Sequence, residues 1–175
     1  MTSAALLSPL EVLRKFDRHD FSIDHFFQVR LSQLGEQPMV EYQDSIMSWK
    51  SCASQADRAV TWLRQRGIQS GDRIGLMAYN HPATVVLLIA CARMGAIVVP
   101  CNPDFEAREA KYIFEHAGVR GVICSPEPLA RVLEATSHMT PAPWKVVIEE
   151  DQPGSEPSLL HQWHLAEPDT RTRTG

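Results

Sequence analysis

Hydrophobic positions cluster in the middle of the chain, where residues 71–103 contain few polar interruptions. This pattern predicts a strand, a helix and a second strand, at residues 73–79, 82–94 and 97–99. The apolar residues of the helix cover every face, which predicts that it is packed on all sides. A strand–helix–strand crossover is nearly always right-handed and makes its two strands parallel. We therefore expect a buried βαβ unit at the centre of the fold.

Turn and cap residues set the limits of this unit. Asn80 or His81 can cap the first backbone amides of the helix, and Pro82 suits its first turn because proline has no N–H group to satisfy. Gly95 suits the left-handed residue that ends a helix.

Shorter helical and extended patterns flank the central unit. Helices are predicted at 25–34, 49–66, 106–116 and 125–133, a hairpin at 39–49, and strands at 121–124 and 144–148. Ser48 is expected to cap the second helix, and the Ser125-Pro126-Glu127 stretch to begin the fourth. Alternating strands and helices predict an α/β fold, a mostly parallel sheet with helices on both faces.

Three regions are expected along the chain. Residues 1–22 form an N-terminal arm, in which a capping box at Ser8 favours a short helix. Residues 23–150 form the α/β unit. Residues 151–175 form a loop, one short helix and a polar linker, which suggests a domain that is cut before its end.

Composition limits the function classes. The chain has 175 residues, of which 44% are hydrophobic. It has 17 basic and 21 acidic side chains, and without an excess of basic residues it is not expected to bind nucleic acid. The longest apolar run, Val85–Ala92, is far shorter than the roughly 20 residues that span a bilayer. Without a recognisable leader the expected location is cytoplasmic. The four cysteines form no C-x-x-C pair and are expected to be reduced core thiols, at positions 52, 91, 101 and 124.

An ordered set of short motifs carries a family resemblance. In chain order the motifs are Ser48-Trp49, Gly71-Asp72-Arg73-Ile74, Asn80, Arg93-Met94-Gly95-Ala96, Val99-Pro100-Cys101-Asn102-Pro103, Glu109 and Tyr112. In this order and spacing, over about residues 26–147, the chain resembles the start of the adenylate-forming acyl-CoA synthetases, the AMP-binding or acid:CoA ligase family. The resemblance implies the Rossmann-like N-terminal subdomain of the adenylate-forming fold.

The resemblance also implies an activity for a longer parent protein. Such enzymes activate a carboxylic acid with ATP as an acyl-adenylate and pass the acyl group to coenzyme A, so the implied cofactors are ATP, Mg²⁺ and coenzyme A. The implied partners are the remainder of the AMP-binding domain and the carboxylic acid substrate. This acid is expected to be small or medium-sized, for instance carnitine-like. A homo-oligomer is equally compatible with the sequence. The phosphate loop and metal site of the family are expected beyond residue 175, so the chain alone should be inactive and bind no cofactor.

Three local patterns could suggest a phosphate or metal site, but each has a simpler structural explanation. Gly67, Gly71 and Gly75 lack the Gly-Lys-Ser/Thr ending of a phosphate-binding loop and fit a helix end, a turn and a strand. His161 and His164 share a helical face but have no third metal ligand nearby. The acidic stretch 149–151 is expected to be a solvated strand end. No metal site is predicted.

We assign no catalytic residue from the sequence. Ser54, Ser125 and Cys101 could act as nucleophiles only if a histidine meets them in space. Arg93 stands out because it interrupts an apolar helix in its last turn. Two roles are open for Arg93: a cation at the negative end of the helix dipole, or a contact to a phosphate of coenzyme A in the parent enzyme.

Two other functions compete with the ligase fragment. A free-standing binding or assembly module could keep the scaffold without the chemistry. A small nucleotide-binding protein with a Rossmann-like fold is disfavoured, because no glycine-rich turn follows the strand that ends at Tyr79.

Overall fold

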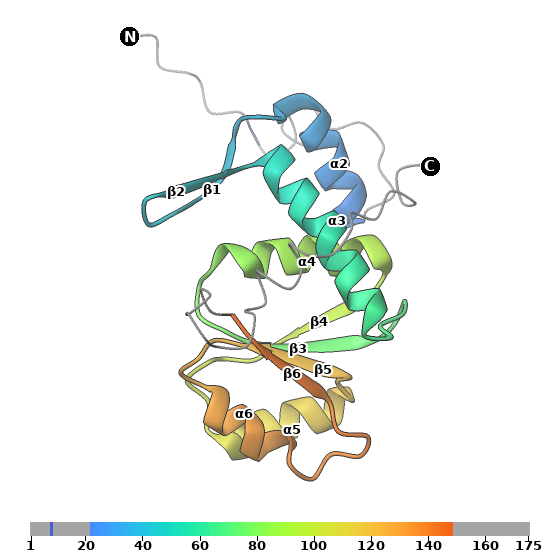
Figure 1. Ribbon diagram of the computed structural model, residues 1–175, viewed down its shortest axis with the longest axis vertical. Coiled ribbons are helices and arrows are strands. Elements are labelled where there is room, and N and C mark those ends of the chain that lie inside the picture. Colours follow the sequence, from blue (N-terminus) through green and yellow to red (C-terminus); the bar gives the residue numbers. More distant parts are fainter. Residues whose placement is uncertain (1–7, 9–21, 149–175) are drawn as a thin grey trace.

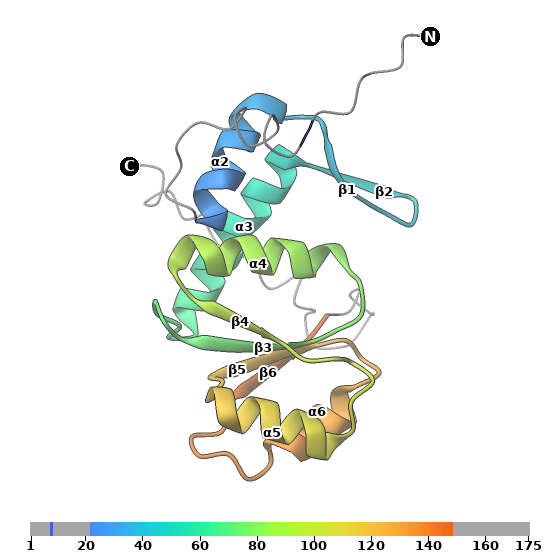
Figure 2. The same ribbon diagram turned by 180° about the vertical axis from the view of Figure 1, so that it is seen from behind.

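The computed structural model describes residue 8 and residues 22–148. Within this part of the chain, a four-stranded sheet lies between two layers of helices (Figure 1). Helices α2, α3 and α4 cover one face and are called the three-helix layer. Helices α5 and α6 cover the other face and are called the two-helix layer (Figure 2). This arrangement confirms the predicted α/β class with helices on both faces of the sheet.

The sheet is parallel and has the strand order β4-β3-β5-β6. The strands are β3 (Arg73–Met77), β4 (Ile97–Pro100), β5 (Gly121–Cys124) and β6 (Trp144–Val147). All four residues of β5 are buried, because this strand lies inside the sheet and both of its faces are covered by helices. The four predicted strands of the sheet are therefore present, with β3 two residues and β6 one residue shorter than the sequence pattern suggested.

Helix α4 (Pro82–Met94) connects β3 to β4 and has the predicted ends. The His81 Nδ1 atom accepts a hydrogen bond from the Ala83 backbone N–H at 3.1 Å, and Gly95 adopts the left-handed conformation with φ 75°. The prediction that this helix is packed on all sides is wrong for the described residues. Leu88 is 43% exposed because it points away from the sheet.

Helices α2 (Ile23–Leu34) and α3 (Trp49–Gln65) complete the three-helix layer. Ser22 and Ser48 cap them, since each hydroxyl oxygen accepts a backbone N–H three residues ahead at 3.1 Å. Helix α2 thus begins two residues before the sequence pattern suggested. The predicted role of Ser48 is confirmed.

An antiparallel hairpin joins α2 to α3. Its strands are β1 (Pro38–Tyr42) and β2 (Ser45–Ser48), which pair with each other and with no strand of the main sheet among the described residues. Figure 1 shows the hairpin projecting beside the helices. Two residues connect the strands, one fewer than the three at 43–45 that the sequence pattern suggested, because Gln43 adopts a positive φ of 51°.

Helices α5 (Ala107–Ala117) and α6 (Leu129–Thr136) form the two-helix layer. Glu106 caps α5 in a capping box with Glu109, whose carboxylate accepts the Glu106 backbone N–H at 3.0 Å. Helix α6 begins after Pro128 rather than at Ser125, so this prediction is corrected. Ser125 instead makes a long-range contact that is described below.

The prediction that the four cysteines are core residues is confirmed. None of the four cysteines forms a disulfide, all are buried, and they lie on both sides of the sheet. Desolvation raises the pKa of Cys52 and Cys101 to about 11 and that of Cys91 to about 12. Since the thiolate is the reactive form, these cysteines behave as small apolar core residues.

Candidate functional site at the carboxyl edge of the sheet

The four parallel strands end at one edge of the sheet, where the connections change direction. From β3 the chain moves outward to β4 through α4, and then crosses to β5 on the other side of β3 through α5. In open α/β sheets, ligands bind outside the carboxyl ends of the strands at such a switch point. The ends of β3 and β5 therefore define the first place to look for a site.

A polar cluster occupies this switch point. The Tyr79 backbone N–H donates to the Ser125 hydroxyl oxygen at 2.9 Å, which joins the segments after β3 and β5. The Tyr79 phenol donates to the Asp104 carboxylate at 2.5 Å. This hydrogen bond is the main cause that raises the pKa of Tyr79. Because the Tyr79 side chain is 41% exposed, the cluster faces solvent.

A cation completes the cluster. Arg131 on α6 donates through Nη2 to the Pro103 carbonyl oxygen at 2.7 Å, and its charge lies near enough to Tyr79 to lower the pKa of the phenol in part. Asp104 is held in turn by its backbone N–H, which donates to the Asn102 side-chain oxygen at 3.0 Å. The edge thus presents a guanidinium, a phenol and a carboxylate that could contact a polar ligand.

A hollow of about 500 Å³ lies beside this edge. It separates the β1–β2 hairpin from the start of α4, and its walls include Tyr42, Met47, Gln55 and His81. The Tyr42 and His81 rings meet edge-on with centroids 5.5 Å apart. Its mixed apolar and polar walls make this hollow a candidate surface for a substrate or for another part of the parent domain.

The predicted nucleophile candidates do not come together with a base among the described residues. Ser125 is 7% exposed and its oxygen is used by the Tyr79 N–H, whereas Ser54 is exposed on α3. Cys101 is buried, and its raised pKa disfavours the thiolate. In the described part of the chain, the edge thus offers polar groups that a ligand could contact, but no nucleophile that is hydrogen-bonded to a base.

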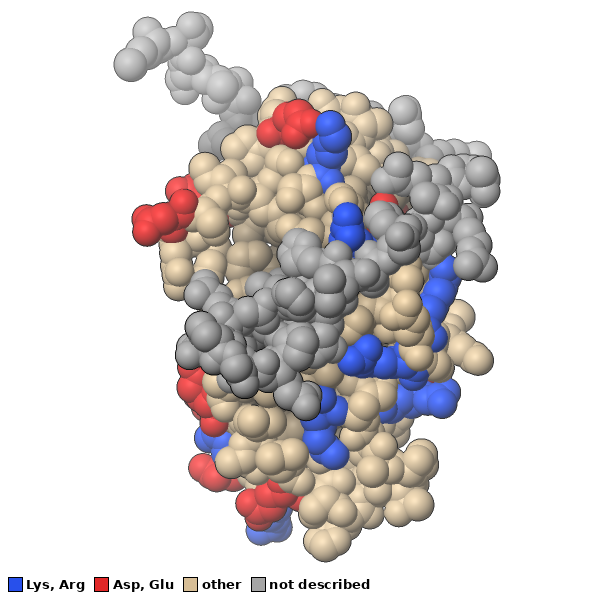
Figure 3. Space-filling view, in the orientation of Figure 1, with Lys and Arg blue, Asp and Glu red and all other residues tan. Residues whose placement is uncertain are grey.

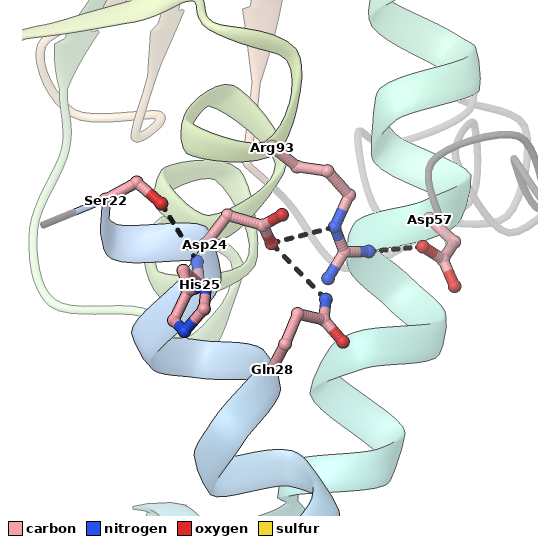
Figure 4. A network of polar contacts seen from close by, with 6 residues as sticks. All are labelled: Ser22, Asp24, His25, Gln28, Asp57 and Arg93. Carbon is pink, nitrogen blue, oxygen red and sulfur yellow. Dashed lines mark hydrogen bonds and ion pairs between the residues drawn. The ribbon is translucent and has the colours of Figure 1, made fainter. Parts of the chain in front are cut away.

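Arg93 lies in the last turn of α4, as the helix-dipole role requires, but its side chain is also buried in an ion-pair network that the sequence did not suggest. Its Nε donates to an Asp24 carboxylate oxygen at 3.1 Å, and its Nη1 pairs with Asp57 (Figure 4). The Arg93 and Asp57 side chains are each 3% exposed, so this ion pair is buried where α2, α3 and α4 meet. Gln28 also donates to Asp24, at 3.3 Å. Arg93 therefore links three helices, a role that sequence spacing did not indicate.

Among the described residues, the glycines that could suggest a phosphate loop lie in other kinds of structure. Gly67 and Gly71 have φ angles of 75° and 85° at a helix end and in a turn, and Gly75 lies in β3 against Phe114. Between residues 22 and 148, no three acidic, cysteine or histidine side chains converge on a possible metal position. The His161–His164 and 149–151 patterns lie outside the described residues. No helix in the described part is long and apolar enough to cross a membrane.

A family model described as AMP-binding enzyme matches residues 27–172. The chain belongs to this family, which confirms the resemblance seen in the sequence. The match to medium-chain acyl-CoA ligase ACSF2, mitochondrial, from Rattus norvegicus is 28% identical over 85 residues and covers 49% of this chain. Surfactin synthase subunit 1 from Bacillus subtilis is 23% identical over 122 residues, or 67% of this chain. These matches span only 14% and 3% of the two relatives.

Solved structures show the same fold. A benzoate CoA ligase from Burkholderia xenovorans LB400 superposes with a TM-score of 0.75 at 19% identity, over 89% of this chain and 31% of that one. The N-terminal domain of FACL13 from Mycobacterium tuberculosis superposes with a TM-score of 0.70 at 23% identity, over 85% of this chain and 37% of that one. The chain thus shares its fold with the N-terminal part of these two proteins.

Proposed function

We propose that this chain is the N-terminal part of an ATP-dependent carboxylic acid:CoA ligase. Its role is to supply the scaffold and the carboxyl-edge surface, where Tyr79, Asp104 and Arg131 meet a ligand. The observation that carries this proposal is the polar cluster at the switch point of a sheet with the family's fold. We also propose that the parent enzyme uses a carboxylic acid as substrate and ATP, Mg²⁺ and coenzyme A as cofactors, and that it is cytoplasmic.

The chain alone is proposed to be catalytically inactive, because its described residues hold no phosphate loop and no metal site. Isothermal titration with ATP should show no binding, and the chain should exchange no pyrophosphate into ATP. Micromolar binding of ATP by the 175-residue chain would contradict this part of the proposal. Sequencing of the gene beyond codon 175 separates the ligase from a free-standing module: a Thr/Ser/Gly-rich loop that contains lysine supports the ligase, whereas a stop codon supports the module.

The contact between Arg93 and a phosphate of coenzyme A remains a proposal for the parent enzyme. Because the guanidinium is buried, this contact requires a phosphate to replace Asp24, whose side chain is 24% exposed, while Asp57 stays in place. Arg93→Ala should then raise the KM for coenzyme A by about five- to a hundredfold and leave ATP–pyrophosphate exchange unchanged.

Asp24→Asn is the matched control, because it weakens the same ion pair and keeps the guanidinium. Because the phosphate must displace Asp24, this variant should lower the KM for coenzyme A rather than raise it. A defect of Arg93→Ala that disappears with dephospho-coenzyme A assigns Arg93 to the 3′-phosphate. An unchanged KM would leave Arg93 with a structural role only.

A further inference from the structure

The two outermost strands of the main sheet, β4 and β6, differ in the backbone groups that they direct outward. In a parallel sheet, every second residue of an edge strand directs its N–H and C=O groups towards the neighbouring strand, and the residues between direct theirs away from it. Among the described residues, β4 pairs with β3 alone and β6 with β5 alone. In the orientation of Figure 1, β6 lies in front and β4 behind. The outward residues decide which edge can take up a further strand.

The outward groups of β4 cannot form a ladder. The Ile97 N–H donates to the Asp72 carbonyl oxygen at 2.8 Å, so Ala96, Val98 and Pro100 are the residues that alternate outward. The Ala96 N–H already donates to the end of α4 at 2.9 Å, and Pro100 has no N–H group. Val98 is thus the one outward donor between residues 96 and 100. Proline at an outward position is typical of a strand that stays at the edge of its sheet.

The outward groups of β6 are complete. The N–H groups of Trp144 and Ile148 donate to backbone carbonyl oxygens in and directly before β5, at 3.3 and 2.8 Å. Lys145 and Val147 therefore direct their N–H and C=O groups away from β5, and in the described part of the chain no strand pairs with them. Two donor–acceptor pairs on alternate residues are what a neighbouring strand requires.

The side chains of β6 also resemble those of an internal strand. Trp144 and Val146 pack towards the three-helix layer, and Val147 packs towards the two-helix layer. All four residues of β6 are half-buried, whereas Ile97 and Pro100 at the ends of β4 are exposed. Strands with both faces covered are typical of the interior of a parallel sheet. The part of β6 that remains open among the described residues is its backbone edge.

Charge argues against a second copy of this chain at the β6 edge. Lys145 is the one charged residue of β6, and Figure 3 shows further lysine and arginine side chains on the right-hand side at the height of the sheet. Two copies of β6 would bring two of these lysines into one ladder, and like charges on paired strands are destabilising. A strand with neutral or acidic side chains fits this edge better.

Chain order favours a segment of the same parent enzyme. The chain covers only 31% and 37% of the two superposed structures, so the proposed parent contains further segments of its AMP-binding domain. Of the described strands, β6 is the last, and consecutive elements of a fold usually lie side by side.

From these observations we infer that β6 is an internal strand in the parent enzyme, where an extended segment from beyond residue 175 pairs with its outward edge. The backbone of this segment bonds with Lys145 and Val147, and β4 stays the free edge of the sheet. The inference rests on the proposed function, because it requires a longer parent protein. It adds the place at which another part of the AMP-binding domain joins this chain.

Hydrogen exchange at single-residue resolution, measured on the 175-residue chain and on the parent enzyme, tests this inference. In the 175-residue chain, the Lys145 and Val147 amides should exchange about tenfold or more faster than the Ile148 amide, which is bonded to β5. In the parent enzyme, both amides should become as protected as that of Ile148. The Val98 amide of β4 is the matched control and should exchange quickly in both proteins.

Proline substitutions give a second measurement. Val147→Pro removes an outward N–H group and leaves the bond of Ile148 to β5 in place, so it should lower the melting temperature of the parent enzyme more than that of the 175-residue chain. Val98→Pro makes the same change on β4 and should affect the two proteins equally. A parent enzyme that folds with Val98→Pro but not with Val147→Pro would support the inference in the same way.

Three results would overturn the inference. Fast exchange of the Lys145 and Val147 amides in the parent enzyme would show that β6 remains an edge there. Protection of both amides already in the 175-residue chain would assign the edge to residues of that chain or, if dilution removes the protection, to a second copy. A stop codon directly after codon 175 would remove the occupant together with the proposed function.

ATP–pyrophosphate exchange by the parent enzyme separates the failure of this inference from the failure of the proposed function. An active parent enzyme in which both amides exchange quickly refutes the inference alone. An inactive parent enzyme in which both amides are protected refutes the ligase function alone.

Discussion

The two helix layers cover the same sheet by different means. The three-helix layer packs apolar side chains but also buries the ion pair of Arg93 and Asp57. In the two-helix layer, Phe114, Val132 and Ala135 pack on the sheet, and the buried polar side chain on its described helices is Thr136. Thr136 donates to a backbone carbonyl of its own helix at 2.8 Å. The stability of the three-helix layer thus depends on ion pairs between helices, whereas that of the two-helix layer depends on the close packing of apolar side chains.

This difference decides which substitutions each layer should tolerate. Buried charges are costly to desolvate, so removal of one partner leaves an uncompensated ion. Apolar contacts respond instead to a change in volume, in either direction. The predictions below separate these two sensitivities.

Asp57→Ala should give the largest effect, because among the described residues it leaves the buried Arg93 guanidinium with Asp24 as its one ion-pair partner. We expect a loss of about 3 to 5 kcal/mol in the free energy of unfolding, measured by urea titration with circular dichroism. In the double variant Asp57→Ala/Arg93→Met no fully buried charge is left; Asp24 loses its ion-pair partner but is 24% exposed and can be hydrated, so much of the loss should be recovered. A double variant as unstable as the single one would show that helix packing, rather than charge pairing, holds this layer.

Gly75→Ala should destabilise the two-helix layer through added volume. The new Cβ atom would lie 2.9 Å from the Phe114 ring, which is fully buried and has little room to move. We expect a loss of about 1 to 3 kcal/mol in the same unfolding experiment. In a Phe114→Leu background the added methyl group should cost clearly less. Equal costs in both backgrounds would mean that the ring does not limit the space at this position.

Alkaline pH should weaken the three-helix layer through Cys91. Burial raises its pKa from 9.0 to about 12, so the folded chain keeps the proton that the unfolded chain releases above pH 9. The stability that this thiol contributes is complete below pH 9 and is lost as pH rises towards 12. Between pH 9 and 10, wild type should lose about 1 kcal/mol more stability than Cys91→Ala. Parallel pH curves would contradict the raised pKa.

Local signals in the sequence predicted most of the fold. Pro82 and Gly95 fixed both ends of α4, because each suits one backbone position that other residues fill poorly. Ser48 was placed as a cap for the same reason. Such features depend on residues a few positions apart, so a single sequence contains the information.

Contacts between distant segments were missed. Arg93 pairs with Asp24 and Asp57, which are 69 and 36 residues away, and Ser125 accepts from Tyr79, 46 residues away. One signal was present for Asp57, which lies on the buried face of α3. A charged residue on an apolar helical face requires a partner, although the sequence does not say which residue that is.

The carboxyl-edge cluster was not predicted from the sequence. Parallel strands require that the segments after β3, β4 and β5 lie at one edge of the sheet, but they do not show that Tyr79 contacts Asp104. Such a contact depends on loop conformation, which hydrophobic periodicity does not encode.

Leu88→Ala should give the smallest effect of these variants. Together with Leu87→Ala, it compares two sides of helix α4. Leu88 is 43% exposed, so its truncation should cost less than about 1 kcal/mol, although the sequence pattern of α4 suggested about 2 to 5. Leu87→Ala is the matched control, because its side chain is 1% exposed and should cost about 2 to 5 kcal/mol. Equal losses for the two variants would mean that both faces of α4 are buried in solution. The same pair measured in the parent enzyme reports whether this outer face is covered there, since a covered Leu88 would become as costly to truncate as Leu87.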